Sequence, residues 1–253
     1  ACIAQQRDYF IIAMRTHCEE AQIVGLNHAW VDLGSIGATL KHLKSEDCQD
    51  IVMAGPIQRP SLTTIKPDLR AARLLPKLLT ARGDDALLSI IVEEFEKEGF
   101  GVVGIDDVLS DLKSPAGALG KLQPDEQQSA DIVRGVEVAR ALGAQDVGQA
   151  VVVQQGFVLG VEAAEGTDAL LARCKDLRRD GAGGVLVKIA KPGQERRTDL
   201  PTIGTNTVTG AANAGLSGIA VEAGGSLIID HDAVVEAANS HGLFIVGIDP
   251  ESV

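Results

Sequence analysis

The stretch SIGATLKHLKSEDCQDIVMAG, residues 35–55, indicates the class of fold to which this chain belongs. The apolar positions of residues 35–44 have helical spacing, and the polar run 45–47 follows them. Residues 50–55 then form an apolar run that is typical of a buried strand and stops at a Gly-Pro pair. An earlier run of the same kind occupies residues 10–14. Strand, helix and strand joined by short polar segments predict a parallel sheet covered by helices, and therefore an α/β fold.

A chain of 253 residues is long enough for one large domain or two modest ones. Asp84 is expected to cap a further helix that ends at Gly99, and residues 102–105 predict one more strand. Residues 113–125 are rich in Pro, Gly and polar side chains, so we expect a domain boundary there. The predicted organisation is an N-terminal Rossmann-like domain, residues 1–118, and a C-terminal mixed α/β domain, residues 119–253.

The second half is predicted to begin with a β-hairpin. Residues 150–153 and 157–161 are apolar runs that flank a Gln-Gln-Gly turn. Shorter apolar and helically spaced segments follow in alternation. The further predicted strands are residues 184–190, 218–222 and 226–230, and the further predicted helices are residues 168–177, 208–214 and 232–240.

Composition narrows the classes of function. The net charge is -12, which argues against broad nucleic-acid binding, and aromatic residues make up 3% of the chain, too few for base-stacking platforms. No apolar run reaches the about 18–20 residues of a membrane span. The four cysteines are scattered without C-x-x-C spacing, so we expect reduced thiols in a cytosolic protein rather than disulfides or a metal site.

Several common catalytic motifs are absent from the sequence. There is no G-x-G-x-x-G or Walker-type loop for a dinucleotide or ATP, and no G-x-S-x-G elbow of a serine hydrolase. The five histidines form no metal-binding pattern, so we expect no zinc site.

Three acidic residues cluster where a predicted strand gives way to a helix. Glu162 and Glu165 lie on the bend, and Asp168 lies just inside the helix, for which Thr167 fits the N-cap position. One interpretation is structural, because an acid in the first turn complements the helix dipole. The second interpretation is functional: the carboxylates hold a hard cation, and the backbone N–H groups of the helix start bind phosphate oxygens.

Two lysines follow in the strand predicted at residues 184–190. Alternation places Val185, Val187 and Ile189 on one face and leaves Lys188 on the opposite face, and Lys191 comes at the end of the strand. A lysine in such apolar surroundings is costly unless it is paired or reaches water. The sequence leaves open an edge-strand lysine that prevents aggregation and a cation directed at a phosphate.

The segment 195–204 adds an aspartate beside a stiff turn. Asp199 immediately precedes the apolar, proline-containing segment Leu200-Pro201, which would hold it in a defined position. Thr202 and the residues after it add hydroxyls and backbone donors for an anion. In the first half, Arg59 follows the end of a predicted parallel strand, a place where α/β proteins bind ligands, although an ordinary surface arginine fits the sequence equally well.

Three stretches taken together resemble the LpxI family of UDP-2,3-diacylglucosamine pyrophosphatases. They are VVVQQGFVLGVEAAEGTDALL (151–171), GVLVKIAKPGQERRTDLPTIG (184–204) and GIAVEAGGSLIID (218–230). The first half agrees in DIVMAGPIQRPSL (50–62), KPDLRAARLLPKLL (66–79), GDDALL (83–88) and EKEGF (96–100). The resemblance covers essentially the whole chain and is specific as a set.

The resemblance implies a two-domain enzyme with its substrate in a cleft between the domains. Members of the family use a divalent cation, typically Mg²⁺, to hydrolyse UDP-2,3-diacylglucosamine to 2,3-diacylglucosamine 1-phosphate (lipid X) and UMP. The family pattern makes Asp199 the catalytic residue, which either orients and deprotonates the water or helps hold the metal. The resemblance covers the positions Glu162, Glu165, Gly166, Thr167, Asp168, Lys188 and Lys191. The predicted metal ligands are Glu162, Glu165 and Asp168, and the predicted substrate contacts are Lys188, Lys191, Gly166, Thr167, Thr202 and Arg59.

One departure from the family concerns the beginning of the chain. Members normally begin with a strand and a Gly-rich turn of the type I-A-G-G-G-x-L-P, which has no counterpart before Ala1. If the segment is truly missing, we expect the first domain to lack a sheet strand and a substrate-contacting turn, which puts activity in doubt. If it exists outside the given sequence, we expect an intact enzyme.

The predicted partner is a lipid-linked nucleotide sugar, with a homodimer left open. We expect a cytoplasmic protein that touches the inner membrane transiently, because its net negative charge disfavours broad adhesion to an anionic leaflet. The principal rival is a non-catalytic lipid or nucleotide-sugar binding protein. A generic α/β enzyme for a different phosphorylated sugar and a structural interaction protein also fit the composition.

Overall fold

The computed structural model describes residues 2–3, 5–55, 67–81 and 83–253. Backbone contacts divide the chain into two compact units, Ala1–Leu109 and Ser110–Val253. The sequence favours a boundary after residue 118, whereas the segment between the two positions already contains a short strand that pairs within the second unit. Among the described residues, no helix is both long and apolar enough to cross a bilayer.

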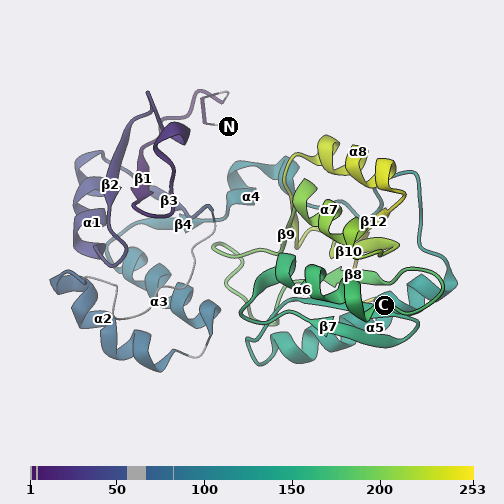
Figure 1. Cartoon of the computed structure of the whole chain (residues 1–253). Coiled ribbons are helices and arrows are strands. Elements are labelled where there is room, and N and C mark those ends of the chain that lie inside the picture. Colours follow the sequence, from purple (N-terminus) through teal and green to yellow (C-terminus); the bar gives the residue numbers. More distant parts are fainter. Residues whose placement is uncertain (1, 4, 56–66, 82) are drawn as a thin grey trace. The chain divides into compact units, whose positions relative to one another are not determined.

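The first unit contains two pairs of parallel strands with helices beside them (Figure 1). Its strands are β1 (Ile11–Met14), β2 (His28–Val31), β3 (Asp50–Val52) and β4 (Gly101–Val103), paired β1 with β2 and β3 with β4. Its helices are η1 (Glu20–Gln22), α1 (Ile36–Ser45), α2 (Leu69–Thr80), α3 (Asp84–Lys97) and α4 (Ile105–Val108). The parallel pairing expected from residues 35–55 is confirmed. The Rossmann-like order stays a prediction, since the described strands form two separate pairs.

The starts of two helices in this unit are set by different residues. Gly83, with φ of 98°, is the N-cap of α3, so the prediction that Asp84 caps this helix is wrong; Asp84 instead lies in the first turn. At α2 the N-cap is Asp68, whose carboxylate accepts hydrogen bonds from the backbone N–H groups of Arg70 and Ala71. The same carboxylate also accepts from Gly37 in the first turn of α1, at 2.6 Å, so one side chain joins two helix starts.

The second unit is built on one six-stranded mixed sheet with the order β5-β12-β10-β8-β6-β7. Strands β8, β10 and β12 are parallel, β6 and β7 form the predicted hairpin, and β5 is antiparallel to β12. A separate parallel pair joins β9 to β11. The strands are β5 (Gly117–Ala118), β6 (Ala150–Gln154), β7 (Phe157–Val161), β8 (Val185–Lys188), β9 (Thr202–Ile203), β10 (Gly218–Glu222), β11 (Leu227–Ile228) and β12 (Phe244–Ile248).

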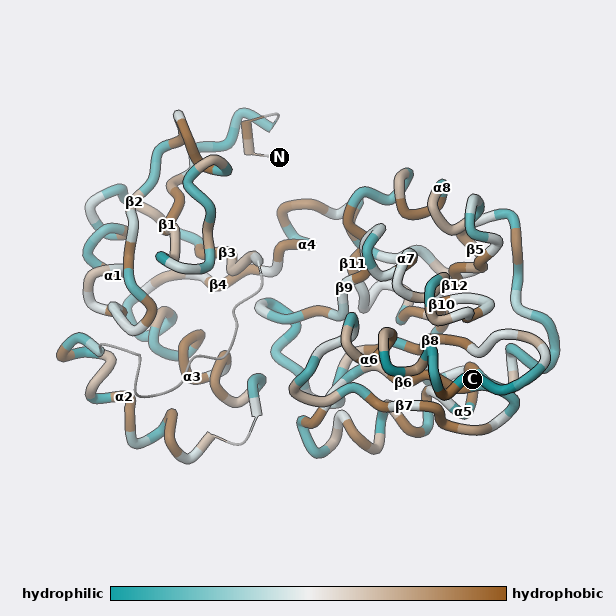
Figure 2. The backbone as a smooth tube through the Cα atoms, in the orientation of Figure 1, coloured by the Kyte–Doolittle hydropathy of each residue, from teal (hydrophilic) through white to brown (hydrophobic). Residues whose placement is uncertain are grey.

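Helices cover both faces of this sheet, as the alternation of apolar side chains requires (Figures 1 and 2). On one face, α5 packs against Val151, Val153, Val185 and Val187. On the opposite face, α6, α7 and α8 enclose a second core that contains Leu186. These helices, with two short turns, are η2 (Ser110–Leu112), α5 (Glu126–Gly143), α6 (Gly166–Cys174), η3 (Lys175–Leu177), α7 (Thr205–Asn213) and α8 (His231–His241).

A buried carboxylate fixes the tip of the β6–β7 hairpin. Asp131 of α5 is 1% exposed and accepts hydrogen bonds from the backbone N–H groups of Gln155 at 2.9 Å and Gly156 at 2.7 Å. The side-chain amide of Gln127, one helical turn earlier, donates to the same carboxylate. The helix thus holds the turn through two backbone donors that would otherwise lack partners within the sheet.

The segment that enters the second unit is anchored before β5. The backbone N–H of Ser114 donates to the carbonyl of Ser226, and Gly224 donates to the carbonyl of Ser114. Ser114 is 2% exposed. At Gly247 in β12, a Cβ atom would collide with the carbonyl oxygen of Pro115, so the close approach of this segment to the sheet requires glycine there.

Most of the elements predicted in the second half are confirmed, with ends shifted by a few residues. Strand β10 has the predicted bounds, and the helix predicted at residues 208–214 begins earlier, at Thr205. Strands β2, β5, β9 and β12 and helix α2 were not predicted. β12 is an inner strand of the sheet.

Candidate active site

The side chain of Lys188 is the centre of the candidate site. Strand β8 lies between β6 and β10, where Lys188 is opposite Ala150 on one side and Val221 on the other. An edge-strand lysine, one of the two interpretations of the sequence, is therefore wrong. Lys188 is 7% exposed, and its ammonium donates to Thr167 Oγ1 at 2.9 Å and to the carbonyl of Thr202 at 3.0 Å.

Three carboxylates act on this buried ammonium. Burial lowers the pKa of Lys188, and the negative charges of Glu162, Asp199 and Asp168 oppose that effect without cancelling it. These acids come from the end of β7, from the loop before β9 and from the first turn of α6. With Thr167 and Thr202, which accept hydrogen bonds from Lys188, the fold therefore brings together six of the predicted site residues from three separate segments of the sequence.

Glu162 and Thr167 connect the sheet to the start of α6. Thr167 Oγ1 donates to Glu162 Oε1 at 2.6 Å, and Glu162 Oε2 accepts from the backbone N–H of Gln149 at 3.1 Å. The N-cap of α6 is Glu165 and its first residue is Gly166, with φ of 79°, so the prediction that Thr167 caps the helix is wrong. The Thr167 hydroxyl instead accepts from Lys188 and donates to Glu162, a use that only the tertiary fold provides.

The carboxylate of Glu165 interacts with Arg173 and not with Lys188 in the described contacts. Its carboxylate pairs with Arg173, two turns further along α6, at 2.9 Å, and accepts from the backbone N–H of Ala163. Hydrogen bonds from its own backbone N–H and from Arg173 lower the pKa of Glu165. Arg173 also donates to the carbonyl of Val161. The charge of Glu165 is thus already balanced by a neighbouring guanidinium.

Asp199 and Lys191 lie in one loop but have different partners. Asp199 Oδ2 accepts a hydrogen bond of 2.6 Å from Gln194 Nε2. The ammonium of Lys191 pairs with Asp146 at 2.5 Å, and this lysine side chain is 10% exposed. Lys191 is therefore neutralised by a carboxylate, so its predicted contact with substrate would have to compete with Asp146.

Two buried polar residues beside the site were not predicted. Glu222, 9% exposed at the end of β10, accepts from the backbone N–H of Ala190 and from Arg196. An acid directly after a buried apolar strand is the same signal that drew attention to Glu162, so the sequence could have indicated Glu222. Gln194, 7% exposed, carries no such signal, because its partners are set by the course of the loop.

The donor set of the site fits the expected cation only in part. Within the described ranges, no group of three or more His, Cys, Asp or Glu side chains lies close enough together to hold a metal ion. Magnesium in phosphoryl-transfer sites is often held by one or two carboxylates together with substrate phosphates. Asp168, which is exposed, and Glu162 beside it meet that smaller requirement in donor chemistry.

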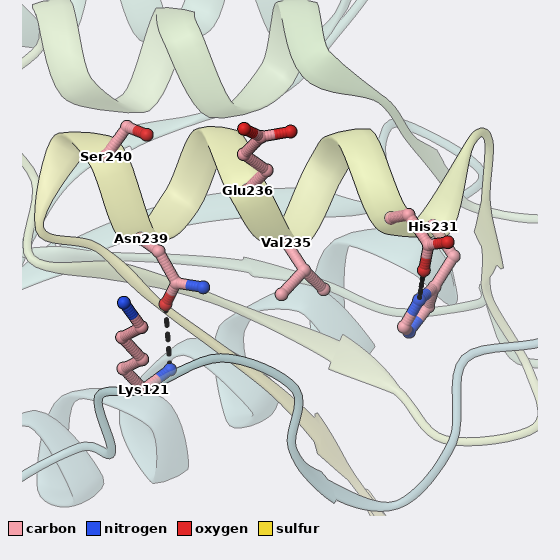
Figure 3. Close-up of a pocket in the computed structure, with 7 residues that line it drawn as sticks. Lys121, His231, Val235, Glu236, Asn239 and Ser240 are labelled. Carbon is pink, nitrogen blue, oxygen red and sulfur yellow. Dashed lines mark hydrogen bonds and ion pairs between the residues drawn. The ribbon is translucent and has the colours of Figure 1, made fainter.

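A hollow on the surface of the second unit lies over α8 (Figure 3). Its lining includes His231, Glu236 and Asn239. The side-chain Oδ1 of Asn239 accepts a hydrogen bond of 2.8 Å from the backbone N–H of Lys121. Of the predicted site residues that the structure describes, none lines this hollow. The predicted contact Arg59 lies outside the described residues.

The mixed sheet with helices on both faces and the buried lysine near three acids define an α/β protein with a charged candidate active site. The chain is a member of the LpxI family: residues 1–112 match the LpxI N-terminal domain and residues 115–246 match the LpxI C-terminal domain. One curated relative is the UDP-2,3-diacylglucosamine pyrophosphatase LpxI of Caulobacter vibrioides (strain ATCC 19089 / CIP 103742 / CB 15). It is 43% identical over 258 residues, which cover 99% of this chain and 92% of the relative. The resemblance drawn from the sequence motifs is confirmed.

Proposed function

We propose that this protein hydrolyses the pyrophosphate bond of UDP-2,3-diacylglucosamine, giving 2,3-diacylglucosamine 1-phosphate and UMP, with a divalent cation assisting attack by water. Support comes from the activity named for the relative that is 43% identical over nearly the whole chain. The observation in the fold that carries the proposal is the buried ammonium of Lys188 surrounded by the charges of Glu162, Asp168 and Asp199.

Lys188 binds and stabilises phosphate charge in this proposal. An ammonium has three N–H donors, and described residues accept two of them, Thr167 Oγ1 and the Thr202 carbonyl. The third donor is directed to a phosphate oxygen of the substrate. Because the group is buried, its interaction with an anion is stronger than it would be in water.

Asp199 orients the attacking water and accepts its proton. The hydrogen bond from Gln194 Nε2 to Oδ2 restricts rotation of the carboxylate and so helps to orient it toward the water. This role stays a prediction that Asp199→Ala tests. We expect turnover to fall by about 10²- to 10⁴-fold, the usual contribution of a general base. Wild-type turnover in that variant would eliminate the assignment.

The charge balance of the site favours a cation. Three acids act on one buried ammonium, and this surplus of negative charge would repel the anionic phosphoanhydride. Bound Mg²⁺ would supply positive charge to the phosphate oxygens, and Asp168 and Glu162 are the residues that would hold it. Glu165 is a weaker candidate, because Arg173 already pairs with it.

A cation requirement predicts that chelation abolishes activity without unfolding the protein. After treatment with EDTA we expect UMP release to stop and circular dichroism to stay unchanged, since both cores lack any metal cluster among the described residues. Added Mg²⁺ should restore the rate. Full activity after exhaustive chelation would remove the cation from the proposal.

The lipid part of the substrate calls for transient contact with the inner membrane from the cytoplasmic side. The net charge of -12 disfavours adhesion to anionic lipids, so we expect weak binding to anionic vesicles that contain no substrate. Tight, salt-sensitive binding to such vesicles would contradict this. The predicted substrate cleft between the two domains and a homodimer stay predictions.

The decisive experiment is an assay of purified protein with UDP-2,3-diacylglucosamine and Mg²⁺, in which UMP and the lipid product are measured by mass spectrometry. UDP-sugars without acyl chains serve as the matched substrates and should react far more slowly. A non-catalytic carrier, the principal rival, would bind the lipid-linked nucleotide sugar but release no UMP. Equal turnover of the unacylated sugars would indicate an enzyme for a different phosphorylated sugar.

A further inference from the structure

Gln194 is a buried glutamine that touches the proposed catalytic aspartate. It is 7% exposed and lies in the loop between β8 and β9, where its backbone N–H donates to the carbonyl of Lys191. Its side-chain Nε2 donates to Asp199 Oδ2 at 2.6 Å. Burial of a polar side chain is costly unless both ends of the amide are satisfied, so its two partners explain why it is there.

The orientation of this amide is fixed by its oxygen. Gln194 Oε1 accepts a hydrogen bond of 2.9 Å from the backbone N–H of Lys191. A backbone N–H can only donate, so the oxygen must face Lys191 and the NH₂ group must face Asp199. An amide flipped by 180° would set two donors against each other at one end and two acceptors at the opposite end. The donor toward Asp199 is therefore imposed by the backbone.

We propose that Gln194 is a positioning residue for the reaction, one that holds the carboxylate of Asp199 in the rotamer that orients the attacking water. This inference rests on the proposed function of Asp199. Loss of the hydrogen bond removes one restraint on the carboxylate, and small misplacements of a catalytic group are known to cost up to about 10²-fold in rate.

A competing role for Gln194 is to stabilise the loop through Lys191 alone, and two substitutions separate these roles. Gln194→Glu keeps an oxygen that accepts from the Lys191 N–H but places a carboxylate against Asp199. Gln194→Met has similar length and loses both hydrogen bonds. If Gln194 positions Asp199, both variants should lower kcat about tenfold or more while KM stays within about twofold. If Gln194 serves the loop alone, Gln194→Glu should keep the wild-type kcat.

A matched control is available in the same unit. Gln127 also donates its side-chain amide to a buried carboxylate, Asp131, four residues further on. Gln127→Met and Gln127→Glu should leave kcat and KM unchanged, because Asp131 holds the hairpin tip at the end of β6 opposite to Ala150 and Lys188. Thermal melts of all variants establish that each is folded at the assay temperature, and Gln194→Asn, which keeps a shorter amide, replaces any that is not.

The outcomes distinguish this inference from the function on which it rests. Wild-type protein that releases no UMP would overturn both. Active wild type, an impaired Asp199→Ala and a Gln194→Glu with unchanged kcat would overturn the positioning role alone. An increase in KM with unchanged kcat would also overturn it, since that result would assign Gln194 to substrate binding.

Discussion

Lys188 is buried because strands pair with β8 on both sides, a feature of its position that the sequence left open. The alternation of Val185, Val187 and Ile189 correctly placed Lys188 on the opposite face, and the structure confirms that these three residues share one core. The pattern could not show whether the strand lies at an edge or in the centre. That depends on β6 and β10, which pair with it from distant parts of the chain.

Replacement of Lys188 by methionine should severely reduce activity. The change removes positive charge from a site with three acids and leaves Thr167 Oγ1 and the Thr202 carbonyl without their donor. We expect kcat/KM to fall by about 10²- to 10³-fold, as for the loss of comparable groups that stabilise developing charge. Lys175→Met, at an exposed lysine, is the control and should have no effect. A loss of less than about threefold at Lys188 would contradict the role.

The partners of the Thr167 and Gln194 side chains could not be predicted from the sequence. Threonine is a residue type favoured at N-caps, so the local pattern predicted that role for Thr167. It gave no indication that the Thr167 hydroxyl would accept a hydrogen bond from Lys188. Gln194 lies in a polar loop, where a glutamine gives no indication of a special role. Its significance comes from a hydrogen bond whose partner is positioned by the whole turn.

At the scale of elements, Asp68 should stabilise the first unit through two helix starts. Its carboxylate accepts from backbone N–H groups at the start of α2 and from Gly37 in α1. Asp68→Ala should therefore cost about 1–2 kcal/mol of unfolding free energy at neutral pH, measured by urea titration. Asp68→Asn should cost less, because asparagine also caps helices well.

The Asp68 effect should depend on pH. Burial alone would raise the pKa of Asp68, but hydrogen bonds from the N–H groups of Ala71, Gly37, Ala38 and Arg70 outweigh it and lower the pKa. The folded state therefore holds the proton less tightly than the unfolded chain. The stabilisation is fully present above the ordinary aspartate pKa of about 3.9 and is lost as pH falls through the folded value. A difference between wild type and Asp68→Ala that persists unchanged at acid pH would contradict this.

The hairpin clamp gives a prediction in which stability and activity separate. Asp131→Ala leaves the backbone donors of Gln155 and Gly156 without their acceptor, so the free energy of unfolding should fall by about 1–3 kcal/mol. Activity per folded molecule should stay near wild type, because the clamp acts at the far end of β6 from Lys188. Chemical denaturation and the UMP assay measure the two effects; a fall in kcat that matches the loss of stability would contradict the separation.

The hairpin itself was predictable because its signal is local. Two apolar runs flank a Gln-Gln-Gly turn, and Gln155 and Gly156 adopt positive φ angles as a tight turn requires. Strand β12 has a similar composition but no turn of this kind beside it. Its place between β5 and β10 results from pairing across long separations, which single-sequence patterns do not encode.

At the scale of the whole molecule, the two units have separate cores. One cluster, which includes Leu40, Val92 and Phe95, lies wholly in the first unit, and the two clusters on either side of the large sheet lie wholly in the second. A fragment of residues 110–253 is therefore expected to fold alone and to melt cooperatively, as circular dichroism would measure. A broad, non-cooperative transition would show that its core depends on the rest of the chain.

The α/β class and a division into two parts followed from the sequence, but the position of the joint did not. The breaker-rich segment 113–125 was expected to contain the domain boundary. Contacts place the division earlier, after Leu109, since Ser114 is already bonded to Ser226 and Gly224 of the second unit. Proline and glycine signal a bend in the chain, and they do not reveal which side of the bend a residue packs against.

The crowding at Gly247 bears on how this protein can be trimmed for expression or crystallisation. The strand that contains it lies so close to the carbonyl of Pro115 that the two chain segments pack directly against each other. A truncation that starts at residue 119, as the composition alone would suggest, would remove β5. Strand β12 would then become an exposed edge strand, which promotes aggregation. A fragment that starts at Ser110 keeps β5 paired with β12.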